Sequence, residues 1–272
     1  MNEVENIVSQ MNYLTPARYI SGRIVEYDLR AANISILRQK EIISQERYEY
    51  LKSLPKITRE IEIGLLEKSD SSVYPALQEG IIEAKKDLVG FNKIDEEQIV
   101  RVANDAIYIN SDVDLKYLQF GDFVYFKPKS EYNIYCKLDK LVIFCKFLED
   151  GNLNIDIKGL DSTDRALELH KDYMVSIIIS TIVLLERSGI QSAIDYLSEV
   201  CKKYVRRELS VEYYRELNKE SLYKFPNITN FAEFGIQYAT DADINLIDVT
   251  YNYNILRELW SILLEIYSMR KK

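Results

Sequence analysis

The chain has few of the residues that build common metal and nucleophile sites. It holds one histidine, His170, and three cysteines among 272 residues. Zinc sites and Ser-His-Asp triads need partners that a single histidine does not supply. Cys136, Cys145 and Cys201 are odd in number and far apart, so the sequence indicates neither a disulfide framework nor a zinc site. We interpret His170, which follows a helical run, as a structural or surface residue.

Glycine and proline are also scarce, and apolar runs are short. Nine glycines and five prolines, together with 29% charged residues, exclude a disordered or low-complexity chain. The most apolar run, residues 175–185, is too short to cross a bilayer and predicts a buried helix. The acidic N-terminus, residues 1–6, is unlike a secretory signal. We therefore expect no membrane partner and a cytoplasmic location in a bacterium or an infected bacterial host.

The chain is rich in apolar residues, tyrosine and negative charge. With 47% hydrophobic residues, it can bury the core of one large domain or two subdomains. The net charge of −8 argues against a generally basic nucleic-acid coat protein but permits a local basic groove. Tyrosine occurs 21 times, often beside Asn, Lys or Ile, which indicates an AT-rich genome such as that of a phage or a low-GC bacterium.

Two aspartates stand where apolar strands should end. Asp28 follows residues 22–27, and Asp105 lies within residues 99–109, where β-branched and aromatic residues flank an Asn-Asp pair. This second pattern predicts a hairpin with Asp105 at its tip. Two carboxylates on neighbouring strand ends can hold two divalent metal ions about 3.5–4 Å apart, which drive phosphoryl or nucleotidyl transfer. Each aspartate alone is also compatible with an ordinary turn residue.

Periodicity divides the chain into a mixed part and a helical part, which predicts an α+β fold. The first part, residues 1–160, combines helical and strand-like segments; the second, residues 161–272, is largely helical. Expected helices cover residues 29–38, 44–51, 57–66, 72–88, 163–187 and 190–208 and the region around Trp260, and expected strands cover 121–126, 132–135, 141–147 and 153–157. Ser44 is a plausible N-cap, because its side chain can accept a bond from the first helical turn.

The order of these segments resembles the palm and thumb of family B DNA polymerases over roughly residues 22–210. Residues 27–35 resemble the segment that follows the first catalytic aspartate and shapes the nucleotide pocket. Residues 103–109, Ala-Asn-Asp-Ala-Ile-Tyr-Ile, resemble the family hairpin Asp-Thr-Asp-Ser-Ile-Tyr-Ile. Residues 148–159 resemble the strand that leads to a Lys-Gly pair at the start of the thumb.

The resemblance implies a palm-like antiparallel sheet in residues 1–160, with a short fingers-like insertion at about 29–93, and a thumb-like part in 161–272. It makes Asp28 and Asp105 the catalytic metal ligands, for Mg²⁺ or Mn²⁺, with the Leu29 carbonyl completing the coordination. Arg30 and Lys85 or Lys86 are then the candidate ligands of the nucleoside triphosphate. An exposed helix face is the alternative for the lysine pair.

Nearby polar residues have two interpretations each. Glu26 shares a strand face with Asp28. It is either a third metal ligand or a solvated edge residue, and we favour the second interpretation. The palm–thumb arrangement predicts DNA contacts by five basic residues: Lys158, Lys202, Lys203, Arg206 and Arg207. The last four also suit a solvated helix end, where positive charge complements the helix dipole.

The sequence therefore predicts a polymerase-like phage protein that extends a DNA primer by a two-metal mechanism, with DNA and nucleoside triphosphates as partners. Ala103 stands at the first hairpin aspartate, and no Tyr-Pro-Ser signature follows Asp28. These departures favour the alternative, a catalytically silent palm-like subunit that binds other replication or transcription proteins. A metal-dependent nuclease is a third interpretation, although it would normally want more clustered acidic residues.

Overall fold

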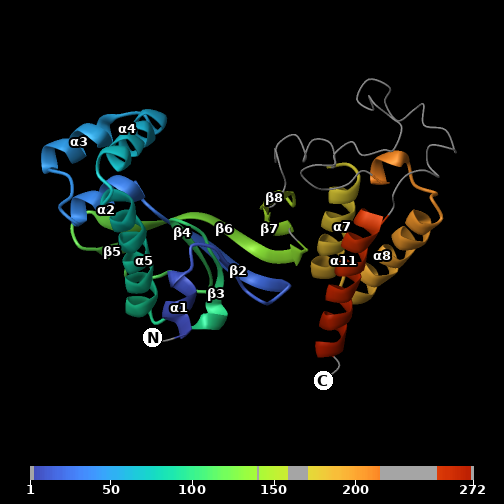
Figure 1. The fold of residues 1–272 in the computed structure, drawn as a ribbon. Coiled ribbons are helices and arrows are strands. Elements are labelled where there is room, and N and C mark those ends of the chain that lie inside the picture. The colour runs from blue at the N-terminus through green and yellow to red at the C-terminus, as the bar shows by residue number, and fades with distance from the viewer. Residues whose placement is uncertain (1–2, 140, 159–170, 215–249, 271–272) are drawn as a thin grey trace. The chain divides into compact units, whose positions relative to one another are not determined.

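The computed structural model describes residues 3–139, 141–158, 171–214 and 250–270 (Figure 1). The chain forms two compact units, one of residues 1–135 with 145–154 and the other of residues 136–144 with 155–272. The expected boundary at Gly159 lies outside the described residues and stays a prediction.

The first unit combines helices with the larger share of the strands. Its helices are α1 (Glu3–Ser9), α2 (Ala32–Gln39), α3 (Gln45–Ser53), α4 (Lys56–Ser69), α5 (Val73–Asn92) and the 3₁₀ turn η1 (Glu96–Gln98). Its strands are β1 (Tyr13–Leu14), β2 (Tyr19–Leu29), β3 (Ile99–Val102), β4 (Ala106–Asn110), β5 (Gln119–Phe120) and most of β6 (Val124–Leu138). Ser44 caps α3 as predicted, since its side chain accepts a bond from Arg47 N at 3.1 Å.

The strands of this unit form a split β-α-β arrangement. Their order is β1-β3-β4-β2-β6, with β5 paired to β6. Strand β4 is antiparallel to both β2 and β3, so β2 and β3 run in the same direction with β4 between them. Helices α2–α5 make the connection from β2 to β3. The end of β2 and the β3–β4 turn therefore lie at the same edge of the sheet.

One face of this sheet is apolar and packs against the helices. Successive strand residues point to opposite faces, and Val25, Tyr27 and Leu29 of β2 all enter the buried core. Ile107 and Ile109 of β4 join the same core, together with apolar residues of α1, α2 and α5. Each fully buried aliphatic side chain contributes about 1.5–3 kcal/mol to stability. The alternate residues of β2, among them Glu26 and Asp28, point to the other face.

Helices α2 and α5 approach each other closely at Gly80. A Cβ at this position would lie 2.3 Å from Cγ2 of Ile36, inside any normal contact distance. Glycine therefore lets α5 pack directly on α2, although it lowers the intrinsic helix propensity by about 1 kcal/mol relative to alanine.

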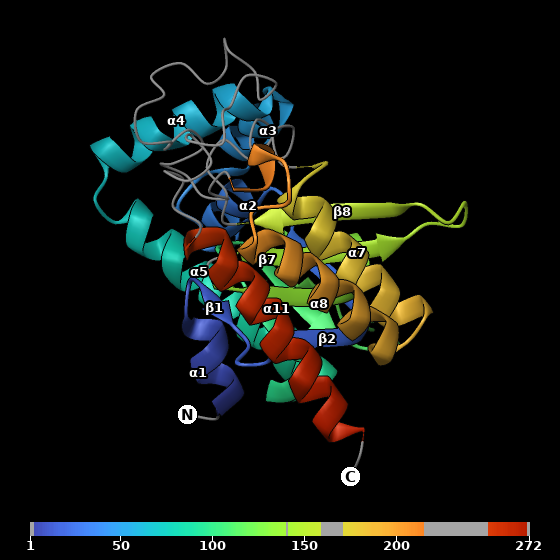
Figure 2. The same ribbon diagram turned by 90° about the vertical axis from the view of Figure 1, so that its right-hand side faces the viewer.

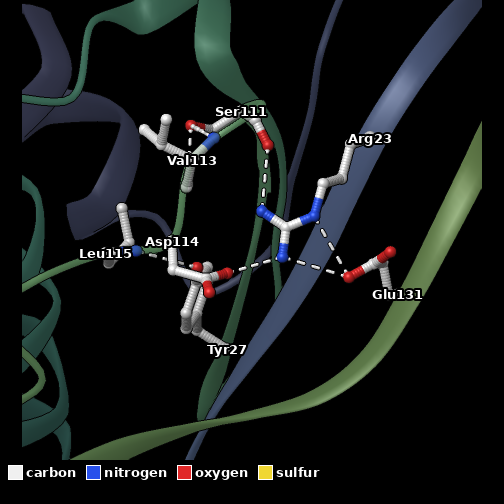
Figure 3. A network of polar contacts seen from close by, with 7 residues as sticks. All are labelled: Arg23, Tyr27, Ser111, Val113, Asp114, Leu115 and Glu131. Carbon is white, nitrogen blue, oxygen red and sulfur yellow. Dashed lines mark hydrogen bonds and ion pairs between the residues drawn. The ribbon is translucent and has the colours of Figure 1, made fainter.

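Arg23 fixes the first half of β2 in place (Figure 3). Its Nε donates to Oε2 of Glu131 at 3.1 Å, and its Nη2 donates to Asp114. Its Nη1 donates to the Ser111 carbonyl at 3.4 Å. The guanidinium thus ties β2 to β6 and to the segment after β4. Hydrogen bonds to Asp114 raise the pKa of Arg23, so this cation stays charged.

The second unit contains the end of β6, parts of β7 (Leu141–Phe147) and β8 (Leu153–Lys158), and a group of helices. Along the sheet, β7 lies between β6 and β8. The helices are α7 (Met174–Arg187), α8 (Ile190–Val205), the 3₁₀ turn η2 (Val211–Tyr214) and α11 (Thr250–Met269). Helix α8 packs against both α7 and α11 (Figures 1 and 2).

The architecture is α+β, as predicted. Two strands expected at 121–126 and 132–135 prove to be mainly parts of one long strand, β6. The helix expected over 163–187 is described from Met174 onwards, and its earlier part lies outside the described residues. Within the described ranges, no helix combines the length and apolarity needed to span a membrane.

Candidate functional site

The fold brings Asp28 and Asp105 to one edge of the sheet. Asp28 lies directly opposite Ala106 in the β2–β4 pairing, and Leu29 N donates to the Asp105 carbonyl at 2.8 Å. Ala103 N donates to the Ala106 carbonyl at 2.9 Å and closes the turn that carries Asp105. The turn meets the end of β2 because β2 and β3 run in the same direction. Sequence reasoning thus predicted this neighbourhood from two separate segments.

Asp28 shares a cation with Glu26. The Lys129 ammonium donates to Oε1 of Glu26 at 3.0 Å and to Oδ1 of Asp28 at 3.4 Å. The Glu26 side chain is only 6% exposed and that of Lys129 is 50% exposed. The expectation that Glu26 is a solvated edge residue is therefore wrong. Partial burial lowers the pKa of Lys129, but the bonds to Glu26 and Asp28 outweigh it and leave the pKa above its usual value.

Aromatic and basic residues extend the polar face beyond Glu26. Tyr108 lies opposite Glu26 and is hydrogen-bonded to it. Burial, followed by the nearby Glu26 charge, raises the pKa of Tyr108 far above its usual value, so the phenol keeps its proton. The Arg101 guanidinium lies 5.6 Å from the centre of the Tyr108 ring. The centres of the Tyr108 and Tyr132 rings are 6.5 Å apart. Within the described residues, Nε and Nη1 of Arg101 are buried without a hydrogen-bond partner.

Lys85 lies beneath the hairpin and is fully buried. Its Nζ is 3.5 Å from the carbonyl oxygens of both Gln10 and Ala103. Burial lowers the pKa of Lys85 to about 8, although the Asp105 charge acts in the opposite direction. In this arrangement Lys85 supports the turn that carries Asp105.

The other two candidate ligands of a triphosphate lie nearer to solvent. Lys86 is partly exposed, and Arg30 is exposed at the end of β2. Arg30 Nη1 donates to the Tyr125 hydroxyl at 3.1 Å, and the guanidinium carbon lies 5.6 Å from the centre of that ring. Nucleotide binding by Arg30, Lys85 and Lys86 stays a prediction.

The basic residues predicted to bind DNA fall into different settings. Lys158 in β8 forms an ion pair with Asp156 at 2.8 Å. Four others are exposed at the end of α8: Lys202, Lys203, Arg206 and Arg207. Of these, Lys202 and Arg206 line a groove of about 400 Å³ between α8 and α11, whereas Lys203 and Arg207 do not. DNA binding by this set also stays a prediction.

In the structure, Asp28 of the predicted two-metal site is part of an ion pair. Mg²⁺ needs free carboxylate oxygens, and the Lys129 ammonium already engages Asp28 and its neighbour Glu26. Among the residues that the structure describes, no group of three or more His, Cys, Asp or Glu side chains could hold a metal ion. The Leu29 backbone contributes its N–H to the Asp105 carbonyl. The expected role of Mg²⁺ or Mn²⁺ stays untested.

Comparison with known proteins gives the origin of the chain but not its chemistry. Residues 3–265 match the protein family described as "Bacteriophage PBS1 gene 130 protein". The chain belongs to this family. The match supports the expected phage origin, and the family description names no polymerase. A comparison with curated proteins found no match.

Sequence reasoning missed Lys129, although this residue forms ion pairs with both Glu26 and Asp28. It is about a hundred positions from its partners in the chain, and no local pattern pairs it with them. The contact of Tyr108 with Glu26 could have been predicted. In an antiparallel pair, placing Asp28 opposite Ala106 also places Glu26 opposite Tyr108. The register of β2 with β4 was the missing step.

Proposed function

We propose that this phage protein is a catalytically silent, palm-like subunit that binds and positions other components of a replication or transcription complex. The observation that carries the proposal is the contact of Lys129 with both Glu26 and Asp28. An ammonium ion 3.0 and 3.4 Å from these carboxylates supplies positive charge where a polymerase would need a divalent metal ion.

The surroundings of the hairpin support the same conclusion. Lys85, the candidate ligand of a triphosphate, is fully buried and contacts backbone carbonyls. Ala103 stands where the polymerase hairpin carries its first aspartate. The sheet has a split β-α-β strand arrangement, and its acidic residues Glu26 and Asp28 share one lysine of the same chain. Such an edge suits a scaffold better than a metal-dependent enzyme.

A second candidate, two-metal nucleotidyl transfer on DNA, is favoured by one specific observation. The split β-α-β arrangement brings Asp28 and the Asp105 turn to the same edge, joined by the hydrogen bond from Leu29 N. Lys129 is half exposed, so metal binding would require it to leave Asp28. In this second candidate function, Mg²⁺ is the cofactor and nucleoside triphosphates are the substrates.

The two candidates differ in primer extension and in metal binding. With a primed template, nucleoside triphosphates and Mn²⁺ or Mg²⁺, we expect no extension by the wild-type protein. Calorimetric titration with Mn²⁺ should show no specific site in the wild type and a weak site in Lys129→Ala, which frees two carboxylates. Lys127→Ala, an exposed lysine on the same strand, is the matched control. If the wild type extends the primer and Asp105→Asn abolishes the extension, the protein is a polymerase and the silent-subunit proposal is wrong.

A further inference from the structure

The groove between α8 and α11 combines positive charge with aromatic rings. Lys202 and Arg206 line it from α8, and Tyr253, Arg257 and Trp260 line it from α11. The two α8 residues are four apart, and the three α11 residues follow a spacing of four and three, so each set lies on one face of its helix. Among the residues that the structure describes, no acidic side chain lines the groove.

The cations of the groove have little internal neutralisation. Among the described residues, Lys202 and Arg257 form no ion pair, and Arg206 has only a long contact of 3.9 Å with Glu208. Tyr253 is 40% exposed, and Trp260 is partly exposed. The groove is lined further by apolar side chains, including Leu256, which is fully buried. Its volume of about 400 Å³ is within the range of pockets that hold a small ligand.

We propose that this groove binds single-stranded nucleic acid, with a base stacked on Trp260 or Tyr253 and the backbone phosphates held by Lys202, Arg206 and Arg257. A positively charged groove with aromatic side chains is the usual arrangement for single strands, because every base offers a flat face for stacking. In a duplex the bases are already stacked on one another and do not reach such rings. The groove shares no residue with the Asp28 site, so the proposal stands apart from the silent-subunit proposal.

Charge and shape favour a nucleic acid over an acidic peptide. Tyr253 and Trp260 are seven residues apart on one helix, about 10 Å along its axis, with Arg257 between them. This row presents a ring, a cation and a second ring in order, which matches the alternation of bases and phosphates. An acidic peptide would satisfy the cations and leave the exposed Tyr253 ring without a flat partner.

Trp260 is the only tryptophan in the chain, so its fluorescence reports on the groove directly. The full-length protein is titrated at low salt with a 12-nucleotide oligo(dT), an abasic oligomer of the same length, inorganic tripolyphosphate and an oligoglutamate peptide. We expect oligo(dT) to quench the fluorescence at concentrations at least tenfold below the other three ligands. Equal quenching by all four, stronger quenching by oligoglutamate, or no quenching by oligo(dT) would overturn the proposal.

Variants separate the groove from general attraction to positive charge. In anisotropy titrations with labelled oligo(dT), Lys202→Ala with Arg206→Ala should weaken binding about tenfold or more. The matched control, Lys203→Ala with Arg207→Ala, removes the same charge from the same helix end but outside the groove, and should change binding about twofold or less. Tyr253→Leu and Trp260→Leu should each weaken binding about 5- to 150-fold if their rings stack on bases. Equal losses in both double variants, or full binding by a folded Tyr253→Leu and Trp260→Leu double variant, would overturn the proposal.

Discussion

The Asp28 edge of the sheet and the α8–α11 groove use charge in opposite ways. At the sheet edge, Lys129 faces Glu26 and Asp28, and the buried Lys85 lies near Asp105. In the groove, Lys202 has no ion pair among the described residues. Charges that are paired within the chain position its own segments, whereas unpaired charges beside aromatic rings remain free for an external anion. The difference indicates where a ligand would bind.

A cavity in the first unit extends this contrast. It has a volume of about 530 Å³ and lies between α2, α5 and residues 117–124. Its cation, Lys40, forms ion pairs with Glu79 at 2.8 Å and Glu83 at 2.9 Å. Asp87 also lines the cavity, and burial, followed by the Glu83 charge, raises its pKa. Among its described lining residues, the larger cavity therefore has no unpaired lysine to offer an anion, unlike the smaller groove.

The largest expected effect concerns Lys85. Its pKa of about 8, against the usual 10.5, means that charging the buried ammonium costs about 3 kcal/mol near pH 7. Lys85→Met keeps the long apolar stem and removes the charge, so it should stabilise the protein by about 2–3 kcal/mol at pH 7. Urea unfolding followed by circular dichroism measures this change.

The pH dependence gives a second measure of Lys85. Between pH 8 and 10.5 the unfolded chain binds more protons at this residue than the folded chain, so wild-type stability should rise relative to Lys85→Met as the pH increases. Lys86→Met, a partly exposed neighbour, should stay within about 0.5 kcal/mol of the wild type. Destabilisation by Lys85→Met would mean that the contacts with Gln10 and Ala103 outweigh the cost of burial.

Local patterns predicted most of the elements, and the order of the segments predicted the Asp28–Asp105 neighbourhood. The alternation in residues 99–109 predicted the hairpin, and Ser44 predicted the start of α3, because both depend on residues close together in the chain. The contact between the two aspartate segments followed from the resemblance to a palm. Each of these features is encoded locally or by segment order.

The residues that set the charge of the two candidate sites were harder to predict. Lys129 meets Glu26 only because β6 pairs beside β2, a contact across 103 positions. The burial of Lys85 follows from how α5 packs under the sheet, since the helix pattern alone allowed an exposed lysine pair. The helical spacing alone places Tyr253, Arg257 and Trp260 on one face of α11. That this face forms a groove with Lys202 and Arg206 of α8 follows only from the packing of the two helices.

Removing Lys129 tests the sheet edge itself. Lys129→Ala leaves the buried Glu26 carboxylate with one partner fewer, and it should cost about 1 kcal/mol because the lysine is half exposed. Lys127→Ala on the same strand should cost less than about 0.5 kcal/mol. Urea unfolding of both variants measures the difference. If both variants lose the same free energy of unfolding, the contacts of Lys129 contribute nothing measurable to stability. Lys129 then does not hold Asp28 in place.

Salt dependence compares the two regions in one assay. Each phosphate contact of a single strand contributes a slope of about −0.7 to the logarithm of affinity against that of salt. Replacing Lys202, Arg206 and Arg257 by Ala should therefore flatten the slope by about 2, whereas Lys129→Ala should leave it unchanged. A change of slope in Lys129→Ala would mean that nucleic acid binds at the sheet edge. The two regions would then not differ in their use of charge.

The smallest expected effect uses the cysteines as probes of the two units. Cys136 and Cys145 are buried, and burial raises the pKa of Cys145 to about 12. Cys201 is less buried and lines the groove. Burial raises the pKa of Cys201 as well, so its thiolate fraction and its rate of alkylation should increase with pH above neutrality.

Native protein treated with a maleimide should therefore be modified first at Cys201, which peptide mass analysis identifies. Oligo(dT) should slow this reaction several-fold, because a strand held by Lys202 and Arg206 would cover the same groove. Cys201→Ser should leave no fast-reacting thiol, which checks the assignment. If oligo(dT) binds and Cys201 still reacts at its original rate, the strand lies elsewhere, and the cations of the groove serve another ligand.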